Sequence, residues 1–245
     1  MRRTNSSNDD WQAVIPDYRI ISIGTLAAHP LWNEKGSVRT GHATTTLINF
    51  GGSAGTMKLL VDPGLPPQAM LARLSERSPI QPAEITHVFL TSFLPERRRA
   101  LRAFESAMWW IGELEKEAAM DGLTEQRDEA DAAGDHEVRA LAEAEIELLQ
   151  RCQIAPDNLA PKIDLFPLPG VTPGTCGLLL ALPVSTVLIC GDAVATGEHL
   201  RQGKVLPHCT NLEQAMESFK EAIEIADVLI PGRDNLLFNP LRRMG

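Results

Sequence analysis

The stretch ITHVFLTSFLPERRRALRAF, residues Ile85 to Phe104, contains the turn from which the fold can be worked out. Its first seven residues are mostly apolar or β-branched, which predicts a buried strand. Pro95 is suited to the first position of a helix, so a helix should follow the turn. A strand, a turn and a helix in this order often carry the chemistry of α/β enzymes. The turn, residues 92–97, however, contains one carboxylate, one guanidinium and no histidine.

The sequence around this stretch contains one pattern twice. Each copy comprises a hairpin that stops at an aspartate, an amphipathic helix and a further strand. The first copy consists of 44–50, 57–61, Asp62, 68–76 and 85–91; the second consists of 177–182, 186–190, Asp192, 212–226 and 227–230. Two such units related by a pseudo-twofold axis predict an α/β fold of four layers, an αβ/βα sandwich.

The expected organisation is a polar N-terminal tail over 1–17 and a single domain over 18–245 with a helical insertion over 112–161. The apolar stripe of the insertion predicts either a solvated flank or a homodimer contact. Ligand sites in α/β folds lie at the ends of strands. Asp62, Ser92, Asp192 and Arg233 follow predicted strands, so they should face one cleft. For Asp62 the alternative of a helix cap is equally open.

Composition narrows the possible partners and compartment. The net charge of −9 argues against nucleic acid and favours a small-molecule anion or a protein partner. The first ten residues lack the apolar core of a signal peptide, and no apolar run is long enough to span a bilayer. Four scattered cysteines without a CxxC pair indicate no disulfide framework. We therefore expect a cytoplasmic protein with no membrane association.

Five landmarks in order make the chain resemble the metallo-β-lactamase superfamily from about Tyr18 to Pro240. They are Leu59 to Gly64, Ile85 to Thr91, Leu168 to Gly177, Cys190 to Ala193 and Ile230 to Asp234. The resemblance implies the αβ/βα sandwich and a site for two divalent metals at the strand ends. Each landmark is weak alone, and the ordered set is specific.

The resemblance also implies where the metal ligands of the family would lie in this chain. The motif His-x-His-x-Asp-His corresponds to Ser92, Leu94, Glu96 and Arg97. The ligand histidine of the Pro-Gly-His-Thr motif corresponds to Val171, and a second histidine of that loop corresponds to Thr175. Asp192 matches the bridging aspartate, and Arg233 stands in place of the last histidine. Every histidine ligand is replaced.

These replacements predict that the chain holds no metal and needs no cofactor. Leu94 and Val171 bring only hydrocarbon, and a guanidinium cannot be deprotonated to ligate a cation. His208, Cys209 and Cys176 are the only residues from which a transition-metal site could be rebuilt.

Helical spacing predicts where the arginines after the turn point. Arg97 shares a face with Ala100, Leu101 and Phe104, so it should point inward. Arg98, Arg99 and Arg102 should lie on the solvent side without a special role. A buried arginine needs a partner, and we hypothesise that Arg97 and Arg233 replace the two metals by pairing with Asp192 and Glu96.

Three functions can be weighed against this pattern, which does not identify a catalytic residue. The first is a degenerate, non-catalytic binding or regulatory protein. The second is a hydrolase of a small anionic or ester substrate that works without metal, with the arginines as an anion clamp and Ser92, Glu96 or Cys176 as reactive groups. The third is a residual metallohydrolase, which fold analogy suggests and the residues contradict.

Overall fold

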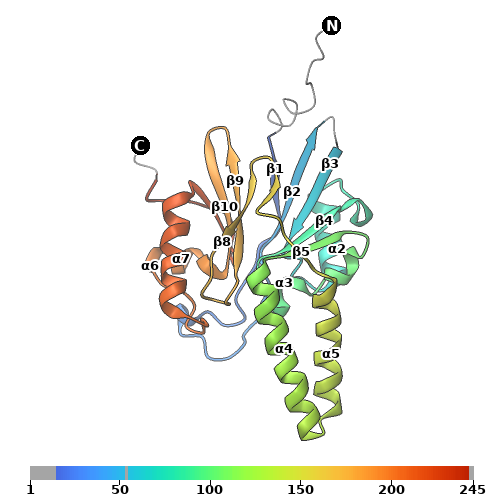
Figure 1. Ribbon diagram of the computed structural model, residues 1–245. Coiled ribbons are helices and arrows are strands. Elements are labelled where there is room, and N and C mark those ends of the chain that lie inside the picture. The colour runs from blue at the N-terminus through green and yellow to red at the C-terminus, as the bar shows by residue number, and fades with distance from the viewer. Residues whose placement is uncertain (1–14, 53–54, 243–245) are drawn as a thin grey trace.

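The computed structural model describes residues 15–52 and 55–242, which form two six-stranded sheets with helices outside them (Figure 1). The first sheet has the order β1 (Asp17–Ser22), β2 (Thr45–Gly52), β3 (Gly55–Val61), β4 (His87–Leu90), β5 (Met108–Ile111) and β6 (Gln153–Ile154). The second has the order β12 (Leu237–Phe238), β11 (Val228–Pro231), β10 (Ser185–Gly191), β9 (Cys176–Leu182), β8 (Ile163–Pro167) and β7 (Asn158–Ala160). Most of the predicted tail lies outside the described residues.

The predicted repeat is present in the strand pairing. The hairpins β2–β3 and β9–β10 are antiparallel. The strand that follows each hairpin pairs parallel to it, with Leu60 opposite Val88 in the first sheet and Leu188 opposite Leu229 in the second. Asp62 and Asp192 therefore stand at corresponding ends of β3 and β10.

Successive side chains of the central strands point to opposite faces of each sheet, so both faces carry apolar side chains that pack against a neighbouring layer. Leu59 and Phe89 point into the core between the sheets, whereas Leu60 and Val88 pack on the opposite face. That outer face is covered by α2 (Pro67–Arg77) in the first sheet and by α7 (Leu212–Ile225) in the second. Because side chains alternate with a period of two, strands covered on both faces are apolar throughout. The predicted four-layer α/β sandwich is confirmed.

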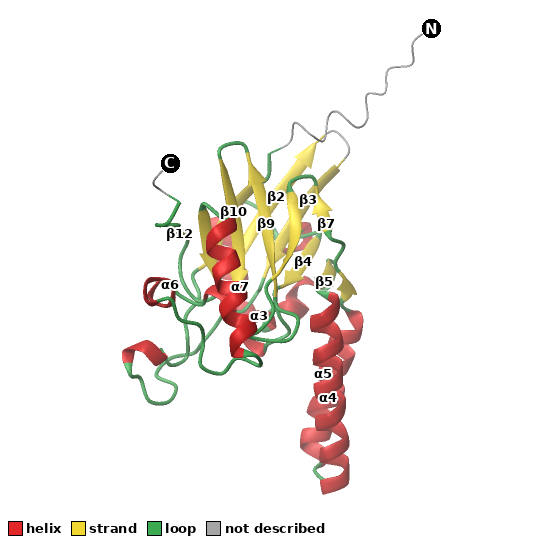
Figure 2. Ribbon diagram, turned by 60° about the vertical axis from the view of Figure 1, so that its left-hand side comes forward, coloured by secondary structure: helices red, strands yellow, loops and turns green. Residues whose placement is uncertain are grey.

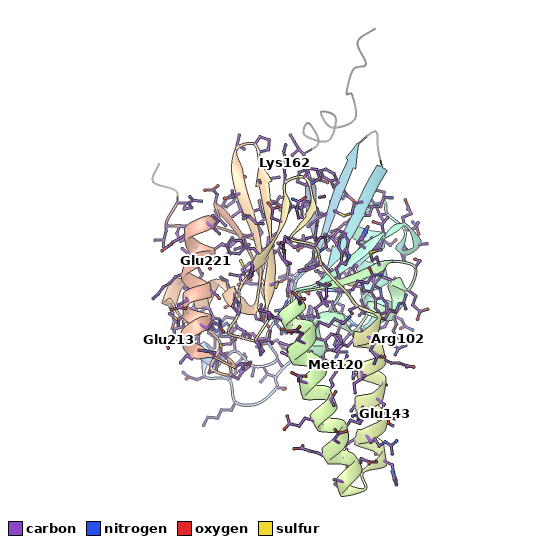
Figure 3. The ribbon with its side chains drawn as sticks, viewed as in Figure 1. Arg102, Met120, Glu143, Lys162, Glu213 and Glu221 are labelled. Carbon is purple, nitrogen blue, oxygen red and sulfur yellow. The ribbon has the colours of Figure 1, made fainter. Side chains whose placement is uncertain are left out.

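The insertion is an antiparallel pair of helices, α4 (Glu113–Ala133) and α5 (His136–Arg151), which extends away from the sheets (Figure 2). Met120 and Glu143 mark its two helices in Figure 3. Gly134 closes α4 with φ 70°, and the Asp135 carboxylate caps α5 by accepting a hydrogen bond from Val138 N.

The expected helical insertion over 112–161 is wrong in its last part, because β6 and β7 occupy most of 153–160. The main-chain groups of Trp110 and Ile111 on β5 pair with this segment, and a helix there could not complete the sheet. The predicted apolar stripe is buried at Ala142, Ile146 and Leu149, whereas Leu141 is 61% exposed. A homodimer contact through this hairpin stays a prediction.

The helix expected after the turn is also shorter than predicted. It is a single turn, α3 (Pro95–Arg98), followed by the 3-10 segment η3 (Leu101–Phe104). The remaining short helices are η1 (Pro30–Trp32), η2 (Pro82–Glu84), η4 (Asp192–Val194) and α6 (Gly197–Gln202). Within the described residues, no helix combines the length and apolarity needed to cross a membrane.

A buried ion-pair network at the candidate site

Four strand ends meet at the candidate site, as the repeat predicts. Asp62 follows β3, Arg97 follows β4, Asp192 follows β10 and Arg233 follows β11. All four side chains are buried, and Arg97 is fully inaccessible to solvent. They form a linear network, Asp62–Arg97–Asp192–Arg233, in which acid and base alternate.

Arg97 occupies the centre of this network. Its Nη1 donates to Asp62 Oδ2 at 2.5 Å, and its Nη2 lies 2.6 Å from Asp192 Oδ1. The turn α3 aims the side chain inward, as predicted from its helical face. Gly64 lets this turn come close, because a Cβ there would lie 2.0 Å from the Glu96 carbonyl oxygen.

Arg233 binds Asp192 from the other side. Its Nε and Nη2 donate to Asp192 Oδ1 and Oδ2, both at 2.9 Å, in the planar two-point geometry that only arginine offers. Gly232 permits this approach, because a Cβ there would lie 2.5 Å from Asp192 Oδ1. Both oxygens of Asp192 are thus engaged by guanidinium groups.

The hypothesis that Arg97 pairs with Glu96 is wrong, and Asp62 is its second partner. Glu96 is half-buried, and its carboxylate forms no ion pair or hydrogen bond with any residue of the described ranges. The Asp62 carboxylate instead accepts hydrogen bonds from Thr91 N at 2.9 Å, Thr91 Oγ1 at 2.7 Å and Arg97. The alternative of a helix cap is wrong as well, since Pro66 stands at the start of α2 without a side-chain cap.

Burial and ion pairing shift the pKa values of the two aspartates in opposite directions. Complete burial alone would raise the pKa of Asp192, but the charges of Arg233 and Arg97 outweigh it and hold that pKa well below its usual range. Burial raises the pKa of Asp62, and the charge of Arg97 with the two Thr91 donors opposes the rise. The pairing keeps the pKa of Arg97 above its ordinary value despite burial. With two acids and two guanidiniums, the ionised network is electrically neutral.

The remaining predicted residues surround the network without joining it. Ser92 is buried, and its Oγ has no hydrogen-bond partner among the described residues. Leu94 is half-buried, and Val171 packs with Leu26, Ala195 and other apolar residues. Thr175 Oγ1 accepts a hydrogen bond from Thr172 N at 3.2 Å. These positions supply packing rather than charge.

Two of the arginines expected to face solvent without a role make specific contacts. Arg98 pairs with Glu145 of α5, and its guanidinium carbon lies 3.9 Å from the centre of the Phe93 ring. Arg99 donates from Nη1 to the Gly41 carbonyl oxygen at 2.5 Å. Only Arg102 is exposed as predicted.

Sequence reasoning missed Glu115, which is 3% exposed and ties α4 to the site. Its Oε1 accepts from Phe93 N at 2.7 Å, and its Oε2 accepts from Thr172 Oγ1 at 2.6 Å. The carboxylate therefore joins the turn after β4 to the loop that carries Val171 and Thr175. Among the charged residues of α4, nothing in the sequence distinguishes this one from its neighbours.

The residues considered for a rebuilt metal site are not grouped around one point. The Cys176 thiol contacts the Gly174 carbonyl oxygen at 3.2 Å, and burial raises its pKa to about 12. Cys209 donates to the Leu206 carbonyl oxygen at 2.8 Å, and burial likewise raises its pKa. Over residues 15–52 and 55–242, no cluster of three or more His, Cys, Asp or Glu side chains is arranged to hold an ion.

A second buried polar cluster was not anticipated from the sequence. His199 Nδ1 lies 2.8 Å from Thr196 Oγ1, and His29 Nε2 lies 3.2 Å from the same oxygen. The ring of His29 stacks on Trp32 at 4.0 Å. Burial, together with the neighbouring His29, lowers the pKa of His199 to about 4, so the ring is neutral at pH 7.

Comparison with known proteins identifies the architecture. No known family profile and no curated protein matches the sequence. A candidate metallo-β-lactamase from Thermotoga maritima has a similar structure, with a TM-score of 0.64 and 18% identity over 91% of this chain and 99% of that one.

Two further solved structures also resemble the chain. A mutant of B. thuringiensis AiiA with N-decanoyl-L-homoserine at its active site gives a TM-score of 0.60 and 16% identity, over 90% of this chain and 94% of that one. An N-acyl homoserine lactone hydrolase with its product at a catalytic metal centre gives 0.59 and 17%, over 90% and 94%. At these identities the likeness concerns the fold, and the chain has the metallo-β-lactamase fold.

Proposed function

We propose that this chain is a non-hydrolytic protein of the metallo-β-lactamase fold, in which two arginines stand where related hydrolases hold metal, and that it acts by binding. The observation that carries the proposal is the position of Arg97, fully buried between Asp62 and Asp192. A protein that kept metal at this point would have to expel a guanidinium from two carboxylates.

The residues at the site do not fit a divalent metal. Both oxygens of Asp192 bind guanidiniums, and Oδ2 of Asp62 binds Arg97. Leu94 and Val171 offer no donor atom, and the guanidiniums of Arg97 and Arg233 cannot ligate a cation. Zinc needs three or four nitrogen, sulfur or carboxylate ligands, which this set does not supply.

A metal-free hydrolase is less well supported. A serine nucleophile needs a general base within hydrogen-bond reach, and Ser92 Oγ has no such partner among the described residues. The raised pKa of Cys176 keeps its thiol protonated at neutral pH. The arginines cannot clamp a substrate anion either, because Asp62 and Asp192 already neutralise them.

The test is a metal titration followed by an activity assay. Protein purified without added metal should contain no stoichiometric zinc or manganese by elemental analysis, and titration with either ion should show no saturable binding. N-hexanoyl homoserine lactone and p-nitrophenyl acetate should not be turned over. A dizinc lactonase treated identically is the positive control. One or two tightly held metals, or turnover that depends on Asp192, would overturn the proposal.

A further inference from the structure

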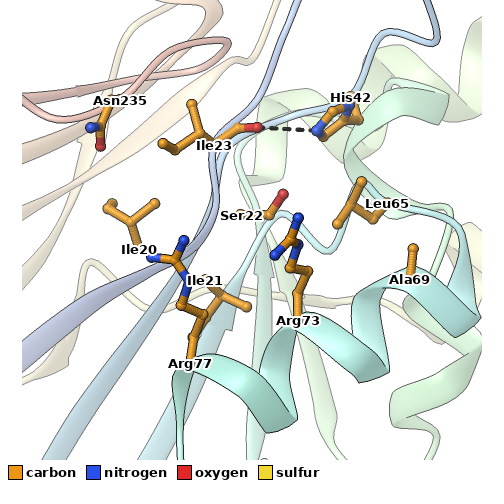
Figure 4. Close-up of a pocket in the computed structure, with 10 residues that line it drawn as sticks. All are labelled: Ile20, Ile21, Ser22, Ile23, His42, Leu65, Ala69, Arg73, Arg77 and Asn235. Carbon is orange, nitrogen blue, oxygen red and sulfur yellow. Dashed lines mark hydrogen bonds between the residues drawn. The ribbon is translucent and has the colours of Figure 1, made fainter.

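A pocket of about 480 Å³ lies between the end of β1 and α2 (Figure 4). Its residues come from β1 and the segment that joins β1 to β2, from α2 and the residues just before it, and from the loop that precedes β12; they are Ile20, Ile21, Ser22, Ile23, His42, Leu65, Ala69, Arg73, Arg77 and Asn235. None of them belongs to the Asp62–Arg97–Asp192–Arg233 network. The pocket is therefore a separate feature of the fold.

Two arginines give this pocket its charge. Arg73 and Arg77 lie one helical turn apart on α2, and Figure 4 shows both guanidiniums directed from the helix toward β1. Arg73 Nη1 pairs with Glu76 at 2.8 Å, but the side chains of both are more than half exposed. The Arg77 guanidinium has no ion-pair or hydrogen-bond partner within the described ranges. The Arg77 carbonyl oxygen accepts a hydrogen bond from Arg19 Nη1 at 2.7 Å.

Placing like charges four residues apart on a helix is unfavourable unless an anion lies between them. One acid, Glu76, is available for two guanidiniums, so the pair retains an excess positive charge. This excess stands out on a chain of net charge −9. It is the arrangement that a phosphate group fits, since two guanidiniums can contact its oxygens together.

The rest of the pocket combines an apolar wall with the polar side chains of Ser22, His42 and Asn235. Ile21 is 1% exposed, and Leu65 and Ala69 extend the apolar wall along the start of α2. His42 closes one side, with Nε2 3.1 Å from the Ile23 carbonyl oxygen and Nδ1 3.2 Å from the Thr40 carbonyl oxygen. A ligand here would bring its charged group to Arg73 and Arg77 and its apolar part to Ile21, Leu65 and Ala69.

We propose that this pocket binds a phosphate monoester of a small apolar alcohol or phenol. Two guanidiniums match the two negative charges of such a group above its second pKa of about 6, and the apolar wall matches the organic part. This inference goes beyond the non-hydrolytic role of the network and does not depend on it. The acidic chain as a whole excludes a long polyphosphate backbone as the ligand.

The experiment uses three probes at pH 8 and low salt, measured by isothermal titration calorimetry. Phenyl phosphate should bind saturably, inorganic phosphate at least about tenfold more weakly because it lacks the apolar part, and benzoate at least about tenfold more weakly because it carries one charge. The double variant Arg73→Gln/Arg77→Gln should lower phenyl phosphate affinity at least about tenfold. Raising the salt to 0.5 M should weaken binding, as expected for exposed charges.

The matched control is Arg102→Gln, which removes another exposed arginine (labelled in Figure 3) and should leave binding unchanged. Ala69→Leu locates the ligand, since it narrows the apolar wall without changing charge and should reduce phenyl phosphate binding while sparing inorganic phosphate. Absence of saturable phenyl phosphate binding would overturn the proposal. Equal affinity for benzoate, or an equal loss in Arg102→Gln, would also overturn it. Metal binding at Asp192 would leave this result untouched, so the two proposals fail separately.

Discussion

At the scale of single residues, Arg97 decides what the candidate site can do. Its two contacts, to Asp62 and Asp192, neutralise acids that lie in a core without access to water. The inward direction of Arg97 could be predicted from its face on the helix. Its partner Asp192 was also predicted, whereas its second partner was not, because Glu96 and Asp62 are both acidic residues near strand ends. Glu96 neighbours Arg97 on a single helical turn and so points about 100° away from it.

Replacing Arg97 by methionine should destabilise the protein by about 3–5 kcal/mol, because two buried carboxylates lose their shared cation. Urea denaturation measures this loss. The double variant Arg97→Met/Asp62→Asn should recover part of it, since one uncompensated charge is removed. Arg102→Gln, on the surface, should change the free energy of unfolding by less than about 0.5 kcal/mol. A loss for Arg97→Met no larger than that of Arg102→Gln would contradict the buried network.

The buried His199 predicts a pH dependence of stability. Its pKa is about 4 in the folded protein and 6.5 in an unfolded chain, so between these values the unfolded state binds more protons. The free energy of unfolding should therefore fall as the pH drops from about 6.5 to about 4, by up to about 1.4 kcal/mol per pH unit. In His199→Gln the midpoint of urea unfolding should depend less on pH over this range. In His136→Gln, at an exposed position, the pH dependence of the midpoint should be unchanged. If the pH dependence of stability were the same in His199→Gln as in the unmodified protein, the attribution to His199 would be refuted.

At the scale of elements, the hairpins and the strands after them could be predicted because alternation and turn residues are local signals. The single turn α3 could not, since its end is set by packing against its neighbours rather than by a breaker residue. Ala100 N donates to the Pro63 carbonyl oxygen at 3.0 Å, and Ala43 N donates to the Glu96 carbonyl oxygen at 2.9 Å. The role of Glu115 was equally hidden, because its partners, Phe93 N and Thr172 Oγ1, are distant from it in sequence.

Close packing around α3 makes Gly64 sensitive to substitution. In Gly64→Ala the new Cβ would meet the Glu96 carbonyl oxygen at 2.0 Å, so α3 must shift and carry Arg97 with it. We expect a loss of about 1–3 kcal/mol in thermal or urea unfolding. Gly122→Ala on α4 is the matched control, because its Cβ would meet no atom within 4 Å and should stabilise the helix by about 0.5–1 kcal/mol. Equal effects at the two glycines would contradict this packing.

At the scale of the whole molecule, two copies of one unit enclose the site. Each copy contributes one acid and one arginine, and the contact between Arg97 and Asp192 joins them. The repeat in the sequence was enough to predict four layers and the meeting of Asp62, Asp192 and Arg233 at one site. The pocket between β1 and α2 was not predicted, because β1 was not recognised and no local pattern shows which side chains converge on Arg73 and Arg77.

The proposed absence of metal predicts that the stability of the whole protein is independent of chelators. Dialysis against EDTA should leave the melting temperature unchanged, and added zinc should not raise it. A site occupied at 100 times its dissociation constant would add about 2.7 kcal/mol to the free energy of unfolding, which a thermal melt detects. A drop in melting temperature with EDTA that zinc reverses would contradict the network.

The alternation of charge in Asp62–Arg97–Asp192–Arg233 also has an evolutionary consequence. Changing either internal member alone, whether to histidine or to a neutral residue, leaves a buried charge unmatched at a cost of about 3–5 kcal/mol. Natural domains are stable by only about 5–15 kcal/mol. A lineage with this network would have to replace Arg97, Arg233, Leu94 and Val171 before a metal could compensate, and its first steps would pass through poorly folded intermediates. The arrangement thus opposes the acquisition of metal at this site.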